Sequence, residues 1–336
     1  MPPYRKKRYG GKLQTKGMSC LVGTESLVRT KDNSENSVPM MSGKSRRIIE
    51  KGAEILFLLC ACISILAVVI ICIYIFAGGI PAIAEIGPLN FIFGKQWKPY
   101  NVPAQYGIFP MILGSIYVTG GAIAIGVPIG LLTAVFMARF CPAKLYKIMK
   151  PMINLLAGIP SIVYGLFGMV VIIPIVRKIA GGDGNSIFTA SVLLGMMILP
   201  TIIGLAETAI ESVPEQYYEG AVALGATHER AVSTVVFPAA RSGILAGVIL
   251  GIGRAIGETM AVIMVAGNQA RMPKGLFAGV RTLTANIVTE MGDAGGLHYD
   301  ALVGTAVVLF GFILILNLCF SVLTNKKPKV REEKTK

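Results

Sequence analysis

The sequence predicts an all-α integral membrane protein with six transmembrane helices, on the basis of its composition and its apolar stretches. The chain of 336 residues is 54% hydrophobic and only 15% charged, which is unlike an ordinary soluble domain. A helix that crosses a bilayer core needs about 20 mostly apolar residues. The stretches that meet this length are 54–77, 112–138, 152–176, 187–211, 242–267 and 300–323.

The distribution of basic residues predicts which side of the membrane each loop faces. Of 32 Lys and Arg residues, 24 lie in one set of segments and 7 in the alternating set. The first set is 1–53, 139–151, 213–241 and 324–336, and the second is 78–111, 177–186 and 268–299. Basic residues concentrate in cytoplasmic loops, so we expect a multi-pass protein of the cell membrane, surrounded by lipid, with both termini in the cytoplasm. The net charge of +14 then reflects topology and predicts no nucleic-acid partner.

The two ends of the chain are expected to be basic cytoplasmic tails around a six-helix domain at 53–324. Residues 1–52 are polar and predicted to be disordered, and 325–336 form the second tail. The triplet Gly43-Lys44-Ser45 matches the end of a phosphate-binding P-loop, but Val38 replaces the required glycine. Any ATP is therefore expected on another chain. The cysteines lie in spans or on the cytoplasmic side and the two histidines are isolated, so neither disulfides nor a metal site is predicted.

Individual residues suggest how the first two spans are placed. The outer loop after the first span carries Trp97, Tyr100 and Tyr106, and such residues are typical of the lipid interface. In the second span, Gly126 and Gly130 have the spacing that lets another helix approach closely.

The later segments carry polar or helix-breaking residues. In the third span Pro160 interrupts the backbone hydrogen bonds, and we expect Ser161 or a neighbouring helix to satisfy the freed carbonyl. Glu207 in the fourth span is close enough to the cytoplasmic end to be an interfacial charge. In the outer loop, apolar residues at helical spacing from Leu276 to Met291 predict a surface helix.

The loop 213–241 predicts a polar two-helix hairpin between the fourth and fifth spans. Ser212 is expected to cap the first helix, which Gly225 ends. Thr227 is expected to cap a second helix that stops at Pro238. By itself this is a common way to connect two spans.

The order of residues in this hairpin resembles the coupling loop of permease subunits of bacterial ABC importers. The matching residues are Glu219, Gly220, Ala221, Gly225 and the sequence Val235-Val236-Phe237-Pro238. The family motif has Ala, Ile and Leu in place of Gly220, Val235 and Phe237, and each replacement keeps the size or apolar character. The resemblance implies that Glu219, Gly220, Ala221, Gly225 and Pro238 couple this chain to a separate ATPase.

The resemblance extends over about 107–323 and is strongest to PstC-type permeases of phosphate importers. The phrases GIFPMILGS, LLAGIPSIVYGLFG, GRAIGETMAVIMVAGN and RTLTANI carry it. It implies a type I permease fold, a PstA-like second permease, a pair of PstB-like ATPases and an extracytoplasmic phosphate-binding protein. This chain would be a transport subunit without catalysis or cofactor, and ATP and Mg would be used by the ATPase.

Two other functions remain open at this stage. Sulfate or molybdate is an alternative cargo, because all tetrahedral oxyanions need a similar path. A secondary transporter would need broken helices in two related halves and a cluster of carboxylates at the middle of the membrane, where Glu258 is the one convincing carboxylate.

Arg254 and Glu258 lie in the middle of the fifth predicted span. At helical spacing they share one stripe with Gly243, Gly247 and Gly251, and each charge costs about 2.5–3.5 kcal/mol there unless it faces protein or water. One interpretation is an ion pair that only locks helices together. The resemblance favours a substrate path, because the family carries the same pair in its path. We therefore expect Arg254 to contact the anion and Glu258 to hold Arg254 when the path is empty.

Overall fold

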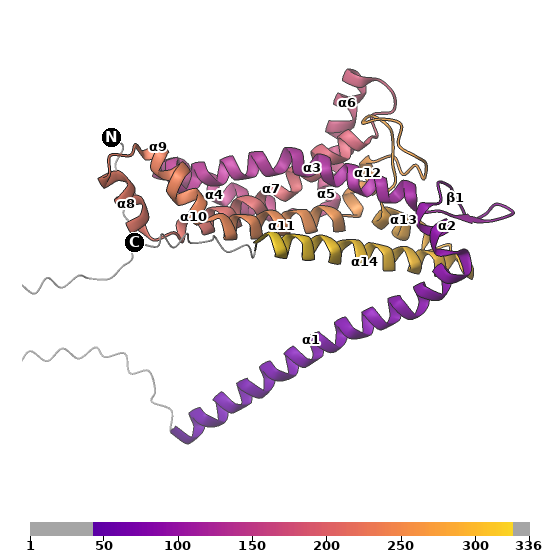
Figure 1. The fold of residues 1–336 in the computed structure, drawn as a ribbon, viewed down its shortest axis with the longest axis horizontal. Coiled ribbons are helices and arrows are strands. Elements are labelled where there is room, and N and C mark those ends of the chain that lie inside the picture. Colours follow the sequence, from indigo (N-terminus) through magenta and orange to yellow (C-terminus); the bar gives the residue numbers. More distant parts are fainter. Residues whose placement is uncertain (1–42, 325–336) are drawn as a thin grey trace, which may run out of the picture. The chain divides into compact units, whose positions relative to one another are not determined.

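The computed structural model describes residues 43–324, which are almost entirely helical (Figure 1). The chain divides into two compact units, Met1–Ile70 and Ile71–Lys336. In the first unit, the described residues belong to the long helix α1 (Gly43–Ile86). Residues 43–52 were expected to be disordered but are helical, because adding residues to an existing apolar helix costs little. The remainder of the predicted tails, 1–42 and 325–336, lies outside the described residues.

The second unit consists of helices and one small hairpin. The hairpin pairs β1 (Trp97–Lys98) with β2 (Gln105–Tyr106) in antiparallel register. The α-helices are α2 (Pro88–Phe93), α3 (Phe109–Val135), α4 (Ala143–Gly158), α5 (Ser161–Phe167), α6 (Ile173–Ala180), α7 (Ile187–Glu211), α8 (Glu215–Ala223), α9 (His228–Ala231), α10 (Phe237–Ala239), α11 (Arg241–Gly257), α12 (Met260–Val265), α13 (Leu283–Glu290) and α14 (Leu297–Thr324). Three π-helical segments continue them, η1 (Phe136–Phe140), η2 (Gly168–Ile172) and η3 (Val232–Val236).

Five helical segments are long and apolar enough to cross a membrane. They are Glu50–Ile86, Phe109–Phe140, Ser161–Ala180, Ile187–Glu211 and Leu297–Cys319. The sixth span arises when His228–Ala239 and Arg241–Gly257, which meet at a bend of 70°, are counted as one. The prediction for the fourth span, 187–211, agrees with α7 at both ends.

Two predicted spans contain a break between helices. The third was expected to begin at 152, but α4 ends at Gly158 and the candidate span begins at Ser161, because Pro160 cannot donate a backbone hydrogen bond. The predicted loop 139–151 is accordingly mostly helical. The fifth was expected to be continuous over 242–267, but α11 ends at Gly257 and a new helix begins at Met260.

Helix α7 is the centre of the second unit. In its most apolar stretch 67% of the residues are buried, against no more than 33% in the other candidate spans. On one side α3 packs so closely that a Cβ on Gly126 would lie 2.7 Å from Ile198. On another side α11 packs so closely that a Cβ on Gly247 would lie 2.9 Å from Leu205. The prediction that Gly126 and Gly130 allow close helix packing is confirmed.

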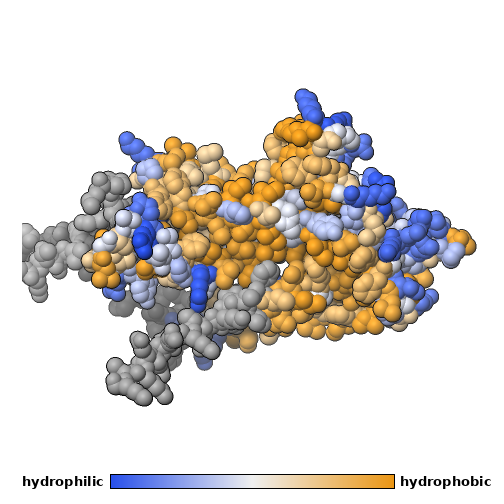
Figure 2. All heavy atoms as spheres, turned by 45° about the horizontal axis from the view of Figure 1, so that its top comes forward, coloured by the Kyte–Doolittle hydropathy of each residue, from blue (hydrophilic) through white to orange (hydrophobic). Residues whose placement is uncertain are grey.

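Apolar and polar side chains are separated along the helices. Figure 2 shows hydrophobic residues covering the middle of the viewed face and hydrophilic residues gathered toward its ends. Exposed apolar residues run along several helices, among them Leu132, Leu155, Val170 and Ile175. This distribution is the one that a bilayer stabilises.

The outer loops differ from the sequence prediction in two places. Trp97 and Tyr106 do not face the lipid interface but are buried, with Trp97 only 5% exposed, in an apolar cluster with Phe91 and Leu302. The helix expected from Leu276 to Met291 is only α13, because Thr282 caps it by accepting a hydrogen bond from the Ala285 N–H.

Candidate functional site

The break between α11 and α12 is the first candidate site. α11 ends at Gly257, Glu258 is extended with φ −71° and ψ 125°, and α12 begins at Met260. A break at membrane depth frees backbone groups from their helical partners, and it is tolerated only where protein or water surrounds it. The break therefore marks a place where polar groups meet inside the helical unit.

Glu258 stabilises the start of α12 and does not pair with Arg254. Its Oε1 accepts a hydrogen bond from the Ala261 N–H at 3.2 Å, so the carboxylate caps the new helix. Its carbonyl oxygen accepts a hydrogen bond from the Thr284 hydroxyl at 3.3 Å. The expected ion pair with Arg254 is wrong, because the break removes the i to i+4 register that the pair requires.

Arg254 lies in the last turn of α11, where its charge interacts favourably with the helix dipole. It is half-buried and forms no hydrogen bond or ion pair with any residue in the described part of the chain. The expected glycine stripe is occupied by α7: a Cβ on Gly251 would lie 2.9 Å from Ile202. Open space lies instead beside Gly253 and Gly257, where a Cβ would meet no atom within 4 Å. The donors of Arg254 are thus unused beside an open face of α11.

The segment before α13 supports this break through hydrogen bonds. The Leu283 N–H donates to Ser115 Oγ on α3 at 3.0 Å, and the hydroxyls of Thr282 and Thr284 lie 3.1 Å apart. Thr284 then reaches the Glu258 carbonyl. These threonines belong to the phrase RTLTANI, which contributes to the family resemblance, but the sequence predicted no role for them. The signal in the sequence is the pair Thr282 and Thr284 at the start of α13, where Thr282 is the N-cap.

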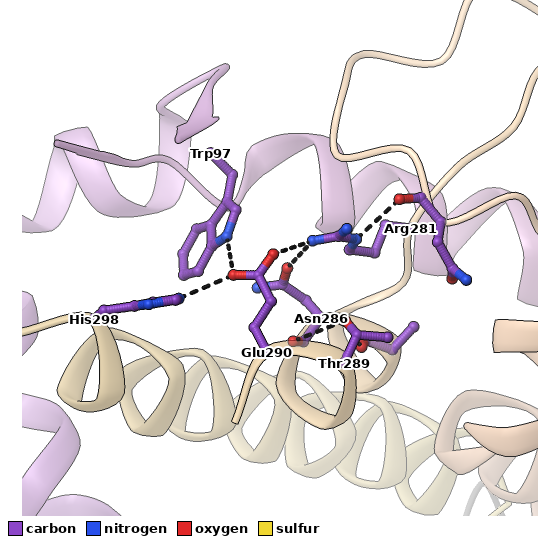
Figure 3. Close-up of polar contacts among 8 residues, drawn as sticks. Trp97, Arg281, Asn286, Thr289, Glu290 and His298 are labelled. Carbon is purple, nitrogen blue, oxygen red and sulfur yellow. Dashed lines mark hydrogen bonds and ion pairs between the residues drawn. The ribbon is translucent and has the colours of Figure 1, made fainter. Parts of the chain in front are cut away.

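A carboxylate organises the end of the unit that carries the β1–β2 hairpin (Figure 3). One oxygen of Glu290 accepts hydrogen bonds from Trp97 Nε1 at 2.8 Å and from His298 Nε2 at 2.9 Å, and the other oxygen pairs with Arg281. Arg281 also donates to Asn286 Oδ1 at 3.1 Å. This network joins the β1–β2 hairpin, α13 and α14. His298 has a structural role in this network.

The hairpin α8–α10 is the second candidate site. Gly225 has φ +86°, as expected for the end of a helix, and the Ala226 N–H donates to the Ala221 carbonyl at 3.1 Å. The tip is exposed and apolar: Leu224 is 91% exposed. Glu219, Gly220 and Gly225 are exposed and Ala221 is half-buried, so these residues lie on or near the surface.

The caps of this hairpin differ in part from the prediction. Ser212 does not cap α8: it follows the last turn of α7, and Pro214 occupies the N-cap position. Thr227 does cap α9, by accepting a hydrogen bond from the Arg230 N–H at 3.4 Å. The backbone N–H of Glu229 and the Thr227 hydroxyl hold the pKa of the Glu229 carboxyl below its ordinary value.

Pro238 does not end the second helix as predicted. It lies in the first turn of α10, where a proline needs no N–H donor, and the chain bends by 70° only before α11. The wider turns of η3 lead into it, with the Phe237 N–H donating to the Val232 carbonyl. The exposed Pro238 therefore marks the passage from the hairpin into the membrane helix.

Arg139 joins the base of the hairpin to the membrane helices. At the end of η1, it donates to the Ile210 carbonyl of α7 at 3.1 Å and pairs with Glu215 of α8 at 3.5 Å. Within the hairpin, the Tyr218 hydroxyl lies 2.9 Å from His228 Nδ1. The first turn of α8 is therefore held against the ends of η1 and α7.

Glu207 is buried rather than interfacial, since it is only 1% exposed. It accepts hydrogen bonds from the Tyr146 hydroxyl and Lys150 Nζ, each at 2.7 Å. The prediction failed because α4, which supplies both donors, folds back against α7. Among the residues described, no group of three or more His, Cys, Asp or Glu is placed to hold a metal ion.

The sequence is similar to a known family and to several known proteins. Residues 126–326 match the family described as binding-protein-dependent transport system inner membrane component. The chain is 33% identical over 298 residues to the probable ABC transporter permease protein YqgH of Bacillus subtilis, covering 86% of this chain and 96% of that protein. It is 35% identical over 261 residues to the phosphate transport system permease protein PstC of Mesorhizobium japonicum, covering 71% and 79%. Similarity to the probable PstC of Methanocaldococcus jannaschii is 31% over 275 residues, covering 76% and 86%.

Solved structures share the fold at lower identity. A subunit of a bacterial alginate ABC transporter aligns with a TM-score of 0.55 at 15% identity, covering 82% of this chain and 96% of that one. A subunit of the inward-facing methionine transporter MetNI aligns with a TM-score of 0.52 at 21% identity, covering 64% and 93%. These similarities concern the fold alone.

Proposed function

Because the chain belongs to the family of binding-protein-dependent transport system inner membrane components, we propose that it is the transmembrane permease subunit of an ATP-driven phosphate importer. Its type I permease fold and its similarity to PstC permeases support this function. The observation that carries the proposal is Arg254, a guanidinium with unused donors beside the open face of α11 and next to a broken helix.

The chemistry of the break suits an oxyanion in transit. The guanidinium offers a fixed fork of donors that matches phosphate oxygens. Glu258 keeps α12 capped and so holds the break open beside Arg254. Since Glu258 does not neutralise Arg254, the positive charge is available to an arriving anion. Arg254 is only half-buried, so a bound anion can leave the site.

The family acts with a second permease, an ATPase and a substrate-binding protein. We assign a PstA-like permease to the open face of α11, where Leu250, Gly253, Gly257 and Met260 are exposed. We assign a pair of PstB-like ATPases to the hairpin α8–α10, and an extracytoplasmic phosphate-binding protein to the outer side. This chain is a transport subunit and not itself catalytic; ATP and Mg belong to the ATPases, and this chain binds no cofactor. Both termini face the cytoplasm.

Another oxyanion is the remaining alternative cargo. Sulfate and molybdate are tetrahedral like phosphate, and a guanidinium binds each of them. A secondary transporter is not favoured, because the family of this chain is that of importers with binding proteins.

Uptake by the assembled complex tests this function. Vesicles with the complete complex should accumulate radiolabelled phosphate when ATP is supplied, and vesicles without this subunit should not. Unlabelled sulfate in excess should leave phosphate uptake unchanged. If the complex takes up sulfate or molybdate in preference to phosphate, the proposed cargo is wrong. If uptake is equal without this subunit, the proposed permease role is wrong.

Substitution of Arg254 tests the site itself. Arg254→Gln should abolish uptake while the complex still assembles, and Arg254→Lys should keep partial uptake because a point charge lacks the planar fork. As a matched control, Arg241→Gln removes the same charge from the other end of α11 and should transport normally. If Arg254→Gln prevents assembly, Arg254 is a structural residue.

A further inference from the structure

The connection between α4 and α5 is held by a side-chain hydroxyl in place of a backbone hydrogen bond. In an unbroken helix the N–H of residue 160 would bond to the carbonyl of Leu156, but Pro160 has no N–H. The Leu156 carbonyl instead accepts a hydrogen bond from the Tyr164 hydroxyl at 2.8 Å. The Ile159 N–H makes a longer contact with it at 3.4 Å. The sequence had suggested Ser161 or a neighbouring helix for this task.

The two sides of this connection are anchored to different helices. α4 is tied to α7 through Tyr146 and Lys150, which both bond to Glu207. α5 packs against α12 so closely that a Cβ on Gly165 would lie 2.6 Å from Met264 Sδ. Since α12 starts directly after the break at Glu258, the connection joins the centre of the unit to the wall of the transport site.

Tyr164 lies beside that wall. It is 6% exposed and belongs to the same buried cluster as Ala255 and Ala261, which flank the break. The next residue, Gly165, packs against Ala261 on the far side of the break, where an added Cβ would lie 3.1 Å from the Ala261 Cα. A phenol donates a single hydrogen bond, so this hydroxyl can donate to the Leu156 carbonyl or to an anion, but not to both at once.

We propose that Tyr164 is a positioning residue whose hydroxyl is a releasable lock on the hinge between α4 and α5, and that an oxyanion bound at Arg254 releases this lock by accepting its hydrogen bond. The proposal rests on the proposed function of Arg254. When the anion takes the hydroxyl, the Leu156 carbonyl loses its short hydrogen bond and α4 is free to turn relative to α5. Binding of the anion at Arg254 thereby changes how α4 and α5 can be oriented along the transport path.

Two substitutions separate a releasable lock from a simple structural bond. Tyr164→Phe removes the hydroxyl and keeps the ring, so in the assembled complex it should lower the maximal uptake rate by about threefold to tenfold, the size of one hydrogen bond. In the structure Ile159 and Pro160 have extended backbone. Pro160→Ala removes the proline that keeps Ile159 extended and supplies an N–H, so α4 should continue through residue 160 and bond the Leu156 carbonyl by its backbone. This variant should lower the maximal rate with an unchanged KM for phosphate. The double variant should regain thermal stability but not rate. Tyr117→Phe, on the exposed side of α3, is the matched control and should transport normally.

Spin labels report the hinge without measuring transport. In a cysteine-free complex, labels at Asn154 on α4 and Lys178 on α6 should show one narrow distance distribution that broadens when phosphate is added. Tyr164→Phe should broaden it without phosphate, and Pro160→Ala should keep it narrow with phosphate. The lock is overturned if the double variant transports at the wild-type rate, or if Tyr164→Phe changes neither uptake nor distances. If the wild-type complex carries sulfate instead of phosphate, only the proposed cargo is wrong. The same spin-label distances, measured with sulfate, then test the proposed lock.

Discussion

Single residues set the polar contacts that join the helices, and Glu207 is the most demanding of them. A carboxylate that is 1% exposed is stable only if its partners satisfy it. Tyr146 and Lys150 both bond to it at 2.7 Å. Lys150 itself is partly exposed, so its ammonium can reach water if the pair is broken. Loss of Lys150 should therefore destabilise the protein more than loss of the charge on Glu207.

This inequality predicts the order of two substitutions. Lys150→Met leaves the buried carboxylate with one donor and should destabilise the complex by roughly 3 kcal/mol. Glu207→Gln keeps an acceptor for Tyr146 and releases Lys150 to water, so it should cost only about 1 kcal/mol. Unfolding of the purified complex followed by circular dichroism measures both. Equal losses, or a larger loss for Glu207→Gln, would show that Glu207 is not buried as a charge.

At the scale of elements, the hairpin α8–α10 combines a fixed base with an open tip. Arg139 ties its base to α7 and to Glu215, while the turn at Gly225 projects from the surface. Gly220 and Gly225 both have open space where a Cβ would be added. They differ in backbone, because Gly220 is helical and Gly225 has a positive φ. Substitutions at these two glycines therefore separate backbone strain from contact with a partner.

Three glycine substitutions test the coupling role of the hairpin. Gly225→Ala should destabilise the hairpin by about 1 kcal/mol because of its left-handed backbone, whereas Gly220→Ala should stabilise α8 by about 0.5–1 kcal/mol. Gly225→Asp should uncouple uptake from ATP hydrolysis while the chain still inserts. ATPase co-purification and phosphate uptake measure the coupling. Normal values for Gly225→Asp would contradict a docking role for this turn.

At the scale of the whole molecule, the polar ends of the second unit are built from different parts of the chain. The β1–β2 hairpin and the hairpin α8–α10 lie at opposite ends of its helices (Figure 1). The first is joined to α13 and α14 through Glu290, and the second to α3 and α7 through Arg139. The segments 139–151 and 213–241 belong to the set of loops that the basic residues of the whole sequence predict to be cytoplasmic, so we expect the side of α8–α10 to face the cytoplasm.

Cysteine labelling checks this orientation. In a cysteine-free background, Val102→Cys at the fully exposed tip of the outer hairpin should react with an impermeant maleimide in intact cells. Leu224→Cys at the tip of the other hairpin should react only after the membrane is opened. Protection of Val102→Cys together with labelling of Leu224→Cys in intact cells would reverse the topology.

The sequence by itself determined the features that depend on local composition and periodicity. Hydropathy located the apolar spans and both ends of α7, whereas the topology that the basic residues predict stays a prediction. The conformation of Gly225 and the close packing of Gly126 against α7 also followed from sequence, because a left-handed turn and a near approach both require the absence of a Cβ.

Only the tertiary structure decided which polar groups meet. Glu207 finds its partners on α4, and the carbonyl at the Glu258 break is reached by Thr284 from another segment. The Arg254–Glu258 pair failed because helical spacing applies only while the helix is continuous, and no proline signals the break at Glu258. Hydropathy and spacing describe neighbours along the chain, whereas a buried charge is satisfied by whichever donor folding brings within about 3 Å.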